Sequence, residues 1–298
     1  MSFSSDIKQE LNNNHSLTDK NNVECELIGY LISVNTNIYK QNEVKFSTEN
    51  DYNIDRFSKL LSNLNIDYDI EIIGKVFNIT TRLKEIKKIN HIEIKDNKIY
   101  TKNIEKLYKE KEGFEQKKAI IKGAFLGAGS INNPENSYHL EIVLSNEENM
   151  TFLKKIIESL NISTKELITK TRCSIYFKES EEISNLLALI GANKAVMKFE
   201  DIRIQKEMRG KVNRIVNCET ANLNKTINAS IEQIGAIKKL QETGKFNKLD
   251  ENLKEIAKLR LENPNISLIE LGKMLKKPLG KSGVNYRLKK IMEIADEE

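Results

Sequence analysis

The chain has 298 residues, enough for one large domain or for two to three smaller domains, each with its own core. Hydrophobic residues make up 39% and charged residues 31%, and no run of 18 apolar residues occurs, which excludes a membrane-spanning helix. Residues 1–14 are too polar for a signal peptide, so we expect a cytoplasmic protein without a membrane partner.

Cysteines and histidines give no sign of a metal site or of a cofactor. They are scattered along the chain and lack the close pairs that a zinc site requires. We therefore expect no cofactor and no metal, and buried or half-buried thiols in a reducing compartment. The residues are Cys25, Cys173, Cys218, His15, His91 and His139.

Positive charge is concentrated in the last third of the chain, although the net charge is only +5. Residues 201–298 hold 20 Lys and Arg against 14 Asp and Glu, whereas residues 1–200 hold 28 against 29. This asymmetry indicates a polyanionic partner for the last third and a different role for the rest.

Two segments share an unusual pattern of apolar and small residues, Leu27–Asn35 (LIGYLISVN) and Ile121–Gly129 (IKGAFLGAG). Each reads as the end of an apolar helix. A strand follows each segment, at Val44–Ser47 and at Leu140–Ser145, and then a helix that ends in Leu-Asn-Ile. The copies are offset by 94 residues at the glycines and by 96 at the Leu-Asn-Ile endings. So steady an offset indicates an internal duplication of a helix–strand–helix–strand unit.

The glycines of these segments predict how the two copies pack. A glycine inside a helix costs about 1 kcal/mol relative to alanine, so Gly29, Gly123 and Gly127 need a structural reason. Because glycine lacks a Cβ, two helix backbones can touch, and we expect the two motif helices to meet at a pseudo-twofold axis. Further strands are predicted at Tyr68–Ile73, Lys75–Thr81, Leu167–Lys170 and Ser174–Lys178.

The two segments resemble a degenerate pair of LAGLIDADG motifs, the signature of LAGLIDADG homing endonucleases. In that family the eighth motif position is acidic, and one acid from each helix binds a divalent metal ion beside the scissile phosphate. The corresponding positions here are Val34 and Ala128, which cannot bind metal, so the nuclease chemistry should be absent. Glu26 and Glu135 lack symmetric counterparts and are poor replacements. Because the duplicated part is nearly neutral, we expect a scaffold or a protein-contact module.

A basic connector is expected at residues 206–245, with a helix from about Thr220 to Thr243 that Gly244 stops. Its cations are candidate contacts to the DNA backbone, and a solvated surface run is an equally weighted alternative. They are Lys206, Arg209, Lys211, Arg214 and Lys225.

Three short helices are predicted in the last fifty residues. The first spans about Glu251–Leu261, and the second begins at a capping box formed by Ser267 and Glu270. After a turn at 276–281, Ser282 is expected to cap the third helix. The expected inner faces are Leu253, Ile256, Ala257 and Leu261 in the first helix, Leu268, Leu271 and Leu275 in the second, and Val284, Leu288, Ile291 and Ala295 in the third. This layout is typical of a helix-turn-helix.

The charge pattern favours DNA binding over a purely structural bundle. Between Leu271 and Met292 there are seven basic residues and no acidic one. Asn and Arg suit base edges in the major groove, and Lys suits the flanking phosphates. The candidate DNA-binding residues are Ser267, Lys276, Lys277, Lys281, Ser282, Gly283, Asn285, Tyr286, Arg287, Lys289 and Lys290. A solvated basic helix in a structural three-helix bundle remains the alternative.

The chain as a whole resembles the WhiA family. The most specific resemblance lies in Val212–Thr226 (VNRIVNCETANLNKT), and Lys281–Leu288 (KSGVNYRL) supports it. The resemblance implies a transcription factor of Gram-positive bacteria, linked to sporulation genes in some relatives and to cell division and chromosome segregation in others. It also implies a C-terminal domain similar to the promoter-reading helix-turn-helix of sigma factors.

We therefore expect an α+β chain, with a duplicated LAGLIDADG-like αββαββ domain followed by an all-α helix-turn-helix domain. The expected limits are 1–110 and 111–205 for the repeats, 206–245 for the connector and 246–298 for the DNA-binding domain. The expected function is a non-catalytic, sequence-specific regulator at the nucleoid that binds double-stranded DNA, with a transcription or division protein as a further candidate partner. The alternatives are a division-associated adaptor and, less favoured, an active endonuclease.

Overall fold

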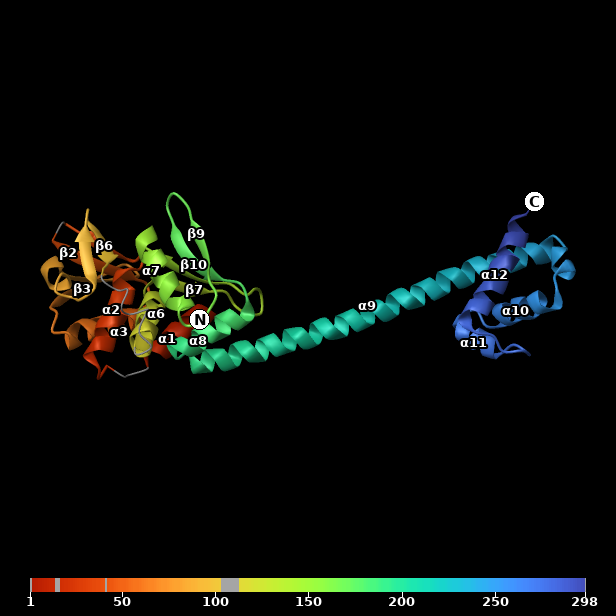
Figure 1. The fold of residues 1–298 in the computed structure, drawn as a ribbon, viewed down its shortest axis with the longest axis horizontal. Coiled ribbons are helices and arrows are strands. Elements are labelled where there is room, and N and C mark those ends of the chain that lie inside the picture. Colours follow the sequence, from red (N-terminus) through yellow and green to blue (C-terminus); the bar gives the residue numbers. More distant parts are fainter. Residues whose placement is uncertain (1, 14–16, 41, 103–112, 298) are drawn as a thin grey trace. The chain divides into compact units, whose positions relative to one another are not determined.

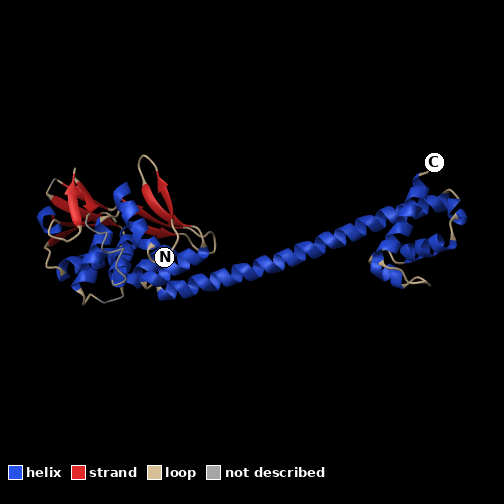
Figure 2. Cartoon of the chain, viewed as in Figure 1, coloured by secondary structure: helices blue, strands red, loops and turns tan. Residues whose placement is uncertain are grey.

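The computed structural model describes residues 2–13, 17–40, 42–102 and 113–297. Internal contacts divide the chain into an N-terminal unit, Met1–Lys206, and a C-terminal unit, Glu207–Glu298. All strands belong to the N-terminal unit, and helices and loops make up the described residues of the other (Figure 2). The expected limit between the repeats, at 110/111, and His15, one of the scattered histidines, lie outside the described residues.

The N-terminal unit contains two copies of an αββαββ arrangement, which confirms the predicted α+β duplication (Figure 1). The first copy consists of α2 (Lys20–Leu31), β1 (Thr36–Tyr39), β2 (Glu43–Thr48), α3 (Asp51–Asn63), β3 (Tyr68–Ile73) and β4 (Val76–Arg82). The second consists of α6 (Phe114–Ala128), β7 (Gly129–Ile131), β8 (Leu140–Leu144), α7 (Glu147–Glu158), β9 (Lys165–Ile168) and β10 (Cys173–Phe177). The αββαββ expectation includes the short strands β1 and β7, but no residue ranges were predicted for them.

Both copies build a four-stranded antiparallel sheet with the same strand order, β1-β2-β4-β3 and β7-β8-β10-β9. In β2, Val44 and Phe46 are buried while their neighbours are half-buried, and β8 alternates in the same way. This period of two places one face of each sheet against the helices.

The outer strands β3 and β9 occupy equivalent edges of the two sheets and are exposed. Ile70 and Ile72 in β3 are 49% and 62% exposed, and Leu167 and Ile168 in β9 are also exposed. Each copy therefore presents apolar side chains at an unpaired sheet edge.

Helices α2 and α6 pack directly against each other, and glycines lie at their closest approach (Figure 1). A Cβ on Gly29 would overlap the main-chain oxygen of Ile120, and a Cβ on Gly123 would overlap that of Glu26. At Gly127 a Cβ would lie 2.7 Å from the hydroxyl of Ser33. The two helices thus touch through their main chains.

Polar side chains tie the ends of these two helices together. The Asn35 amide donates to the main-chain oxygen of Gly127 at 2.8 Å, and the Asn53 amide donates to that of Leu126 at 2.7 Å. The buried hydroxyl of Tyr30 donates to Asn53 in turn. A β-bridge between Ser33 and Leu144 also joins the first copy to the sheet of the second. The two repeats consequently form one continuous core.

A buried ion-pair group lies beside the α2–α6 contact. Arg56 makes two hydrogen bonds of 2.7 Å to the carboxylate of Glu26, and the Lys122 amine lies 3.6 Å from the same carboxylate. Burial lowers the pKa of Lys122 to about 8, although the Glu26 charge acts in the opposite direction. Glu26 is therefore engaged within the fold.

The remaining elements complete the N-terminal unit and lead out of it. They are α1 (Phe3–Asn12), α4 (Leu83–Ile86), the hairpin β5 (Ile92–Lys95) and β6 (Lys98–Thr101), α8 (Ser180–Ile190) and α9 (Asn193–Glu242). No helix in the described ranges is long and apolar enough to cross a membrane.

Helix α9 corrects two expectations, the start of the connector helix and the burial of Cys218. The helix predicted from about Thr220 is the end of a helix that begins at Asn193, because isolated Gly, Asn and Thr residues each cost too little to stop it. Gly244 does follow its end, in the left-handed conformation that stops a helix. Cys218, expected to be at least half-buried, is exposed on α9, whereas Cys25 is buried and Cys173 half-buried.

Replacing Gly123 with alanine is expected to destabilise the N-terminal unit by about 3 kcal/mol or more, because the added Cβ would meet main-chain atoms rather than a movable side chain. Denaturant unfolding followed by circular dichroism measures the loss. As a control, Gly235→Ala in α9, where a Cβ meets nothing within 4 Å, should be neutral or slightly stabilising. Unchanged stability of Gly123→Ala would contradict the main-chain contact.

The second prediction concerns pH. Because the folded chain binds the Lys122 proton less tightly than the unfolded chain, this lysine adds stability as the pH rises from about 8 toward 10.5. Lys122→Met should remove that gain, on the order of 3 kcal/mol. Lys8, whose pKa is also about 8, contributes equally to both proteins. The measurement is the free energy of unfolding of wild type and variant across this range. A wild-type–variant difference that stays constant with pH would refute the role of burial.

Candidate nucleic-acid interface

The C-terminal unit is a helical bundle with its own core. It contains the short 3₁₀ helix η2 (Lys245–Lys248), α10 (Glu251–Glu262), α11 (Leu268–Lys273) and α12 (Lys281–Asp296). Ile237 and Leu240, near the end of α9, are fully buried in the same core. The inner face of α10 differs from the prediction, because Arg260 is buried there while Leu261 is only half-buried.

Helix α11 begins at the predicted capping box. The main-chain N–H of Glu270 donates to the Ser267 hydroxyl at 3.3 Å, and the main-chain N–H of Ser267 donates to the Glu270 carboxylate at 2.9 Å. These hydrogen bonds lower the pKa of Glu270. Ser267, a candidate DNA contact, is half-buried and uses its hydroxyl to begin the helix.

The turn between α11 and α12 depends on a glycine that the sequence analysis did not single out. A Cβ on Gly272 would overlap the main-chain oxygen of Leu279 and would lie 3.0 Å from the side chain of Val284. The main-chain N–H of Leu279 also donates to the Gly272 oxygen at 3.1 Å. Gly272 lies inside a predicted helix, so the same argument that predicted close packing at Gly29 and Gly123 could have predicted it here.

The third helix starts earlier than predicted. Gly280 is its N-cap, in an extended conformation, and the first helical hydrogen bond runs from the N–H of Val284 to the oxygen of Gly280. Ser282, expected to be the cap, therefore lies inside the first turn, where its side chain is exposed.

Helix α12 has two distinct faces. Val284, Leu288, Ile291 and Ala295 are buried, as predicted. On the other side Ser282, Asn285, Tyr286, Lys289 and Lys290 are exposed, Tyr286 to 68%, while Gly283 and Arg287 are half-buried at the margin. The outward residues follow the helical spacing of three and four, so they form one continuous surface.

The cations of this region are free to meet an anion. Lys273, Lys276, Lys277, Lys281, Lys289 and Lys290 are exposed. Over residues 113–297, neither these lysines nor Arg287 forms an ion pair with a carboxylate. Exposed cations without acidic partners provide the positive potential that attracts phosphate groups.

The candidate cations of the connector all lie on α9, but in different surroundings. The Lys206 amine lies 4.8 Å from the centre of the Tyr138 ring in the N-terminal unit. In the C-terminal unit, Arg209, Lys211, Arg214 and Lys225 are exposed, and the Arg214 side chain donates to the main-chain oxygen of Gly210. Since each helical residue turns by about 100°, Arg209 points away from Lys211 and Arg214. These cations therefore do not form one patch.

The positions that would hold metal in a LAGLIDADG nuclease carry apolar residues at the ends of the paired helices. Val34 is 47% exposed and its main-chain N–H donates to the oxygen of Val143, while Ala128 ends α6. Glu26 is bound to Arg56, and Glu135 is exposed in a loop. In the part of the chain that the structure describes, no group of three or more His, Cys, Asp and Glu residues could hold a metal ion.

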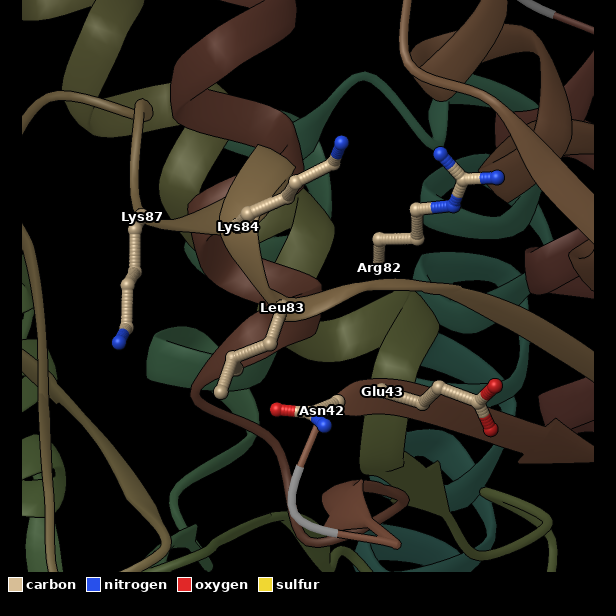
Figure 3. A pocket seen from close by; sticks show the side chains of 6 residues that line it. All are labelled: Asn42, Glu43, Arg82, Leu83, Lys84 and Lys87. Atoms are coloured by element: carbon tan, nitrogen blue, oxygen red, sulfur yellow. The ribbon is translucent and has the colours of Figure 1, made fainter.

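A hollow of about 400 Å³ lies at the rim of the first sheet, beside Asn42, Glu43 and Leu83, and carries the cations Arg82, Lys84 and Lys87. The three cations are exposed. Figure 3 shows Arg82 and Lys84 extending to one side and Lys87 pointing to the other, so the three charged ends do not meet at one point. This hollow is not organised as a binding site.

Family comparisons match both units. Residues 117–209 match the WhiA LAGLIDADG-like domain, and residues 212–295 match the WhiA C-terminal HTH domain. A "Probable cell division protein WhiA" from Clostridium acetobutylicum is 51% identical over 183 residues, which cover 61% of this chain and 58% of the relative. One of the same name from Clostridium perfringens is 45% identical over 227 residues, or 76% of this chain and 68% of the relative. The chain thus matches little more than half the length of the first relative.

Solved structures support the same assignment. Full-length DUF199/WhiA from Thermotoga maritima superposes with a TM-score of 0.63 at 28% identity, covering 99% of this chain and 98% of the other. The N-terminal LAGLIDADG domain of DUF199/WhiA superposes with a TM-score of 0.52 at 22% identity, covering 64% and 92%, which supports the fold of the N-terminal unit.

The close contact at Gly272 leads to a prediction. Gly272→Ala is expected to destabilise the C-terminal unit by about 2–3 kcal/mol or more, because neither the Leu279 main chain nor α12 can move without disturbing the core. Thermal unfolding of the full chain, with hydrogen exchange to locate the loss in α11 and α12, measures the effect. Gly280→Ala is the control, since a Cβ there meets nothing within 4 Å. Equal protection of α11 and α12 from hydrogen exchange in Gly272→Ala and Gly280→Ala would disprove the requirement for glycine at position 272.

Proposed function

The chain belongs to the WhiA family, and from this premise we propose that it is a sequence-specific DNA-binding regulator that reads duplex DNA through α12 and has no nuclease activity. One observation carries the proposal. Helix α12 buries an apolar row and presents Asn285, Tyr286 and Lys289 outward, within a 22-residue stretch that contains no acid.

The chemistry of this surface suits the two kinds of contact that DNA recognition needs. Asn285 and Arg287 can each make paired hydrogen bonds to adenine or guanine in the major groove and so select a sequence. Lys281, Lys289 and Lys290 neutralise backbone phosphates without reading bases. The helix therefore combines specificity with sequence-independent affinity.

Two features of the N-terminal unit support the proposed absence of nuclease activity. Val34 and Ala128 offer no oxygen ligand at the positions where paired acids would have to hold the metal ion. Glu26 is held by Arg56 and Lys122, so its release would leave two buried cations without their partner. The duplicated fold acts here as a scaffold.

The regulatory role is proposed to concern cell division, which the names of the clostridial relatives mention, with transcription control and chromosome segregation as its routes. The protein would then work in the cytoplasm at the nucleoid, with duplex DNA as its main partner.

A division-associated adaptor is the second candidate. Exposed apolar side chains at the edges formed by β3 and β9 favour it, since such edges suit contacts with other proteins. If this candidate is correct, substitutions on α12 would leave the cellular role intact, whereas charged residues in place of Ile70 and Ile72 would abolish it.

Substitutions on α12 test DNA reading. Selection from a random duplex library with the full chain identifies preferred sites, and fluorescence anisotropy over a range of salt concentrations gives affinities. Arg287→Ala should reduce discrimination by about 1–3 kcal/mol at one or two base pairs. Lys290→Ala should weaken all sequences alike and lower the salt slope by about one.

Lys258→Ala is the matched control, because Lys258 is an exposed lysine on α10 outside the acid-free stretch. It should leave sequence discrimination unchanged. If Arg287→Ala and Lys290→Ala both behave like this control, α12 is not the recognition helix.

A further inference from the structure

A cavity of about 250 Å³ in the C-terminal unit lies where α9, α10, α11 and the start of α12 meet. Its lining includes Lys225 from α9, Arg260 from α10 and Lys281 from the first turn of α12, with apolar surface from Leu268 and Ile269. No acidic residue is among its lining residues. The cavity wall therefore carries three positive charges.

Arg260 is the unusual member of this group, since it is a buried cation without a carboxylate partner. Its side chain is 1% exposed, and its Nη1 donates to the main-chain oxygens of Asn263, Pro264 and Ile266, the last at 2.9 Å. Among the described residues, no acid pairs with this guanidinium. Its Nε is buried and lacks a hydrogen-bond acceptor. Unpaired buried charges are rare in folded proteins.

Gln233 adds a second unsatisfied polar atom in the same cavity wall. Its side chain is 5% exposed, and its Oε1 is buried without a donor. A buried polar atom without a partner destabilises the fold, so two of them in the wall of one cavity point to an occupant with hydrogen-bonding groups.

We propose that this cavity binds a phosphoryl group, held by Lys225 and Lys281 at its rim and by the charge of Arg260 at its wall. A phosphoryl group carries close to two negative charges and several acceptor oxygens, which match three cations better than a single carboxylate would. A protonated oxygen of the occupant can also donate to the Oε1 atom of Gln233.

The phosphoryl group has two possible sources, a small phosphorylated molecule or a DNA backbone phosphate beside α12. The second source rests on the proposed function, whereas binding of a free phosphoryl compound does not.

Inorganic pyrophosphate is the probe, titrated into the full chain by calorimetry at ionic strength held constant with sodium chloride. The wild type should bind saturably. Lys225→Gln and Lys281→Gln should each weaken binding about tenfold, which is the usual effect of losing one charged hydrogen bond. Lys238→Gln, the same exchange at an exposed lysine of α9 away from the cavity, should bind like the wild type.

Because Arg260 substitutions can unfold the bundle, its role is followed by NMR in the otherwise unchanged chain. The Nε–H resonance of Arg260 should shift on saturation with pyrophosphate, and this shift should be lost in Lys225→Gln. Absence of saturable binding, or equal binding by Lys225→Gln and Lys238→Gln, would overturn the proposal.

A duplex of mixed sequence separates the two sources. If pyrophosphate displaces the duplex from the wild type but not from Lys225→Gln, the cavity takes a backbone phosphate. If pyrophosphate and the duplex bind the wild type at the same time, the cavity takes a free phosphorylated molecule. Arg287→Ala should retain pyrophosphate binding, so failure of the recognition helix is distinguishable from failure of the cavity.

Discussion

Direct contact between main chains, made possible by glycine, is the constraint on which both units depend. In the N-terminal unit Gly29 and Gly123 let α2 and α6 touch, and this spacing brings Asn35 and Asn53 within hydrogen-bond reach of the α6 main chain. In the C-terminal unit Gly272 lets α11 approach the main chain of Leu279 in the turn before α12. A methyl group at any of these positions would first overlap a main-chain atom, which cannot rotate away as a side chain can.

The same packing explains why the nuclease-like architecture persists without metal-binding acids. The apolar contact between α2 and α6 holds the two copies together, and it does not require acidic residues at the helix ends. Those ends contribute main-chain bonds instead, such as that from Val34 to Val143. Apolar residues in place of the acids therefore leave the scaffold intact. The excess of positive charge lies elsewhere, in the last third of the chain.

Periodic and local features of this fold were predictable from the sequence. The duplication, most strand positions, the Ser267 capping box and the inner face of α12 follow from spacing rules that operate within a few residues. Features set by tertiary context were not. The helix α9 overrides weak local preferences, Arg56 meets a glutamate 30 residues away, and Arg260 is buried where a charge is ordinarily exposed. The candidate surface on α12 was predictable, but the cavity beside it was not.

The exposed strands β3 and β9 bear on how one copy of this chain could meet another. Their free main-chain groups and apolar side chains could template the addition of a strand from another molecule. Charged residues interrupt both strands, Asp69 and Glu71 in β3 and Lys165 and Glu166 in β9. The acids of β3 would repel a second β3 placed beside them, which disfavours pairing between two copies of this edge.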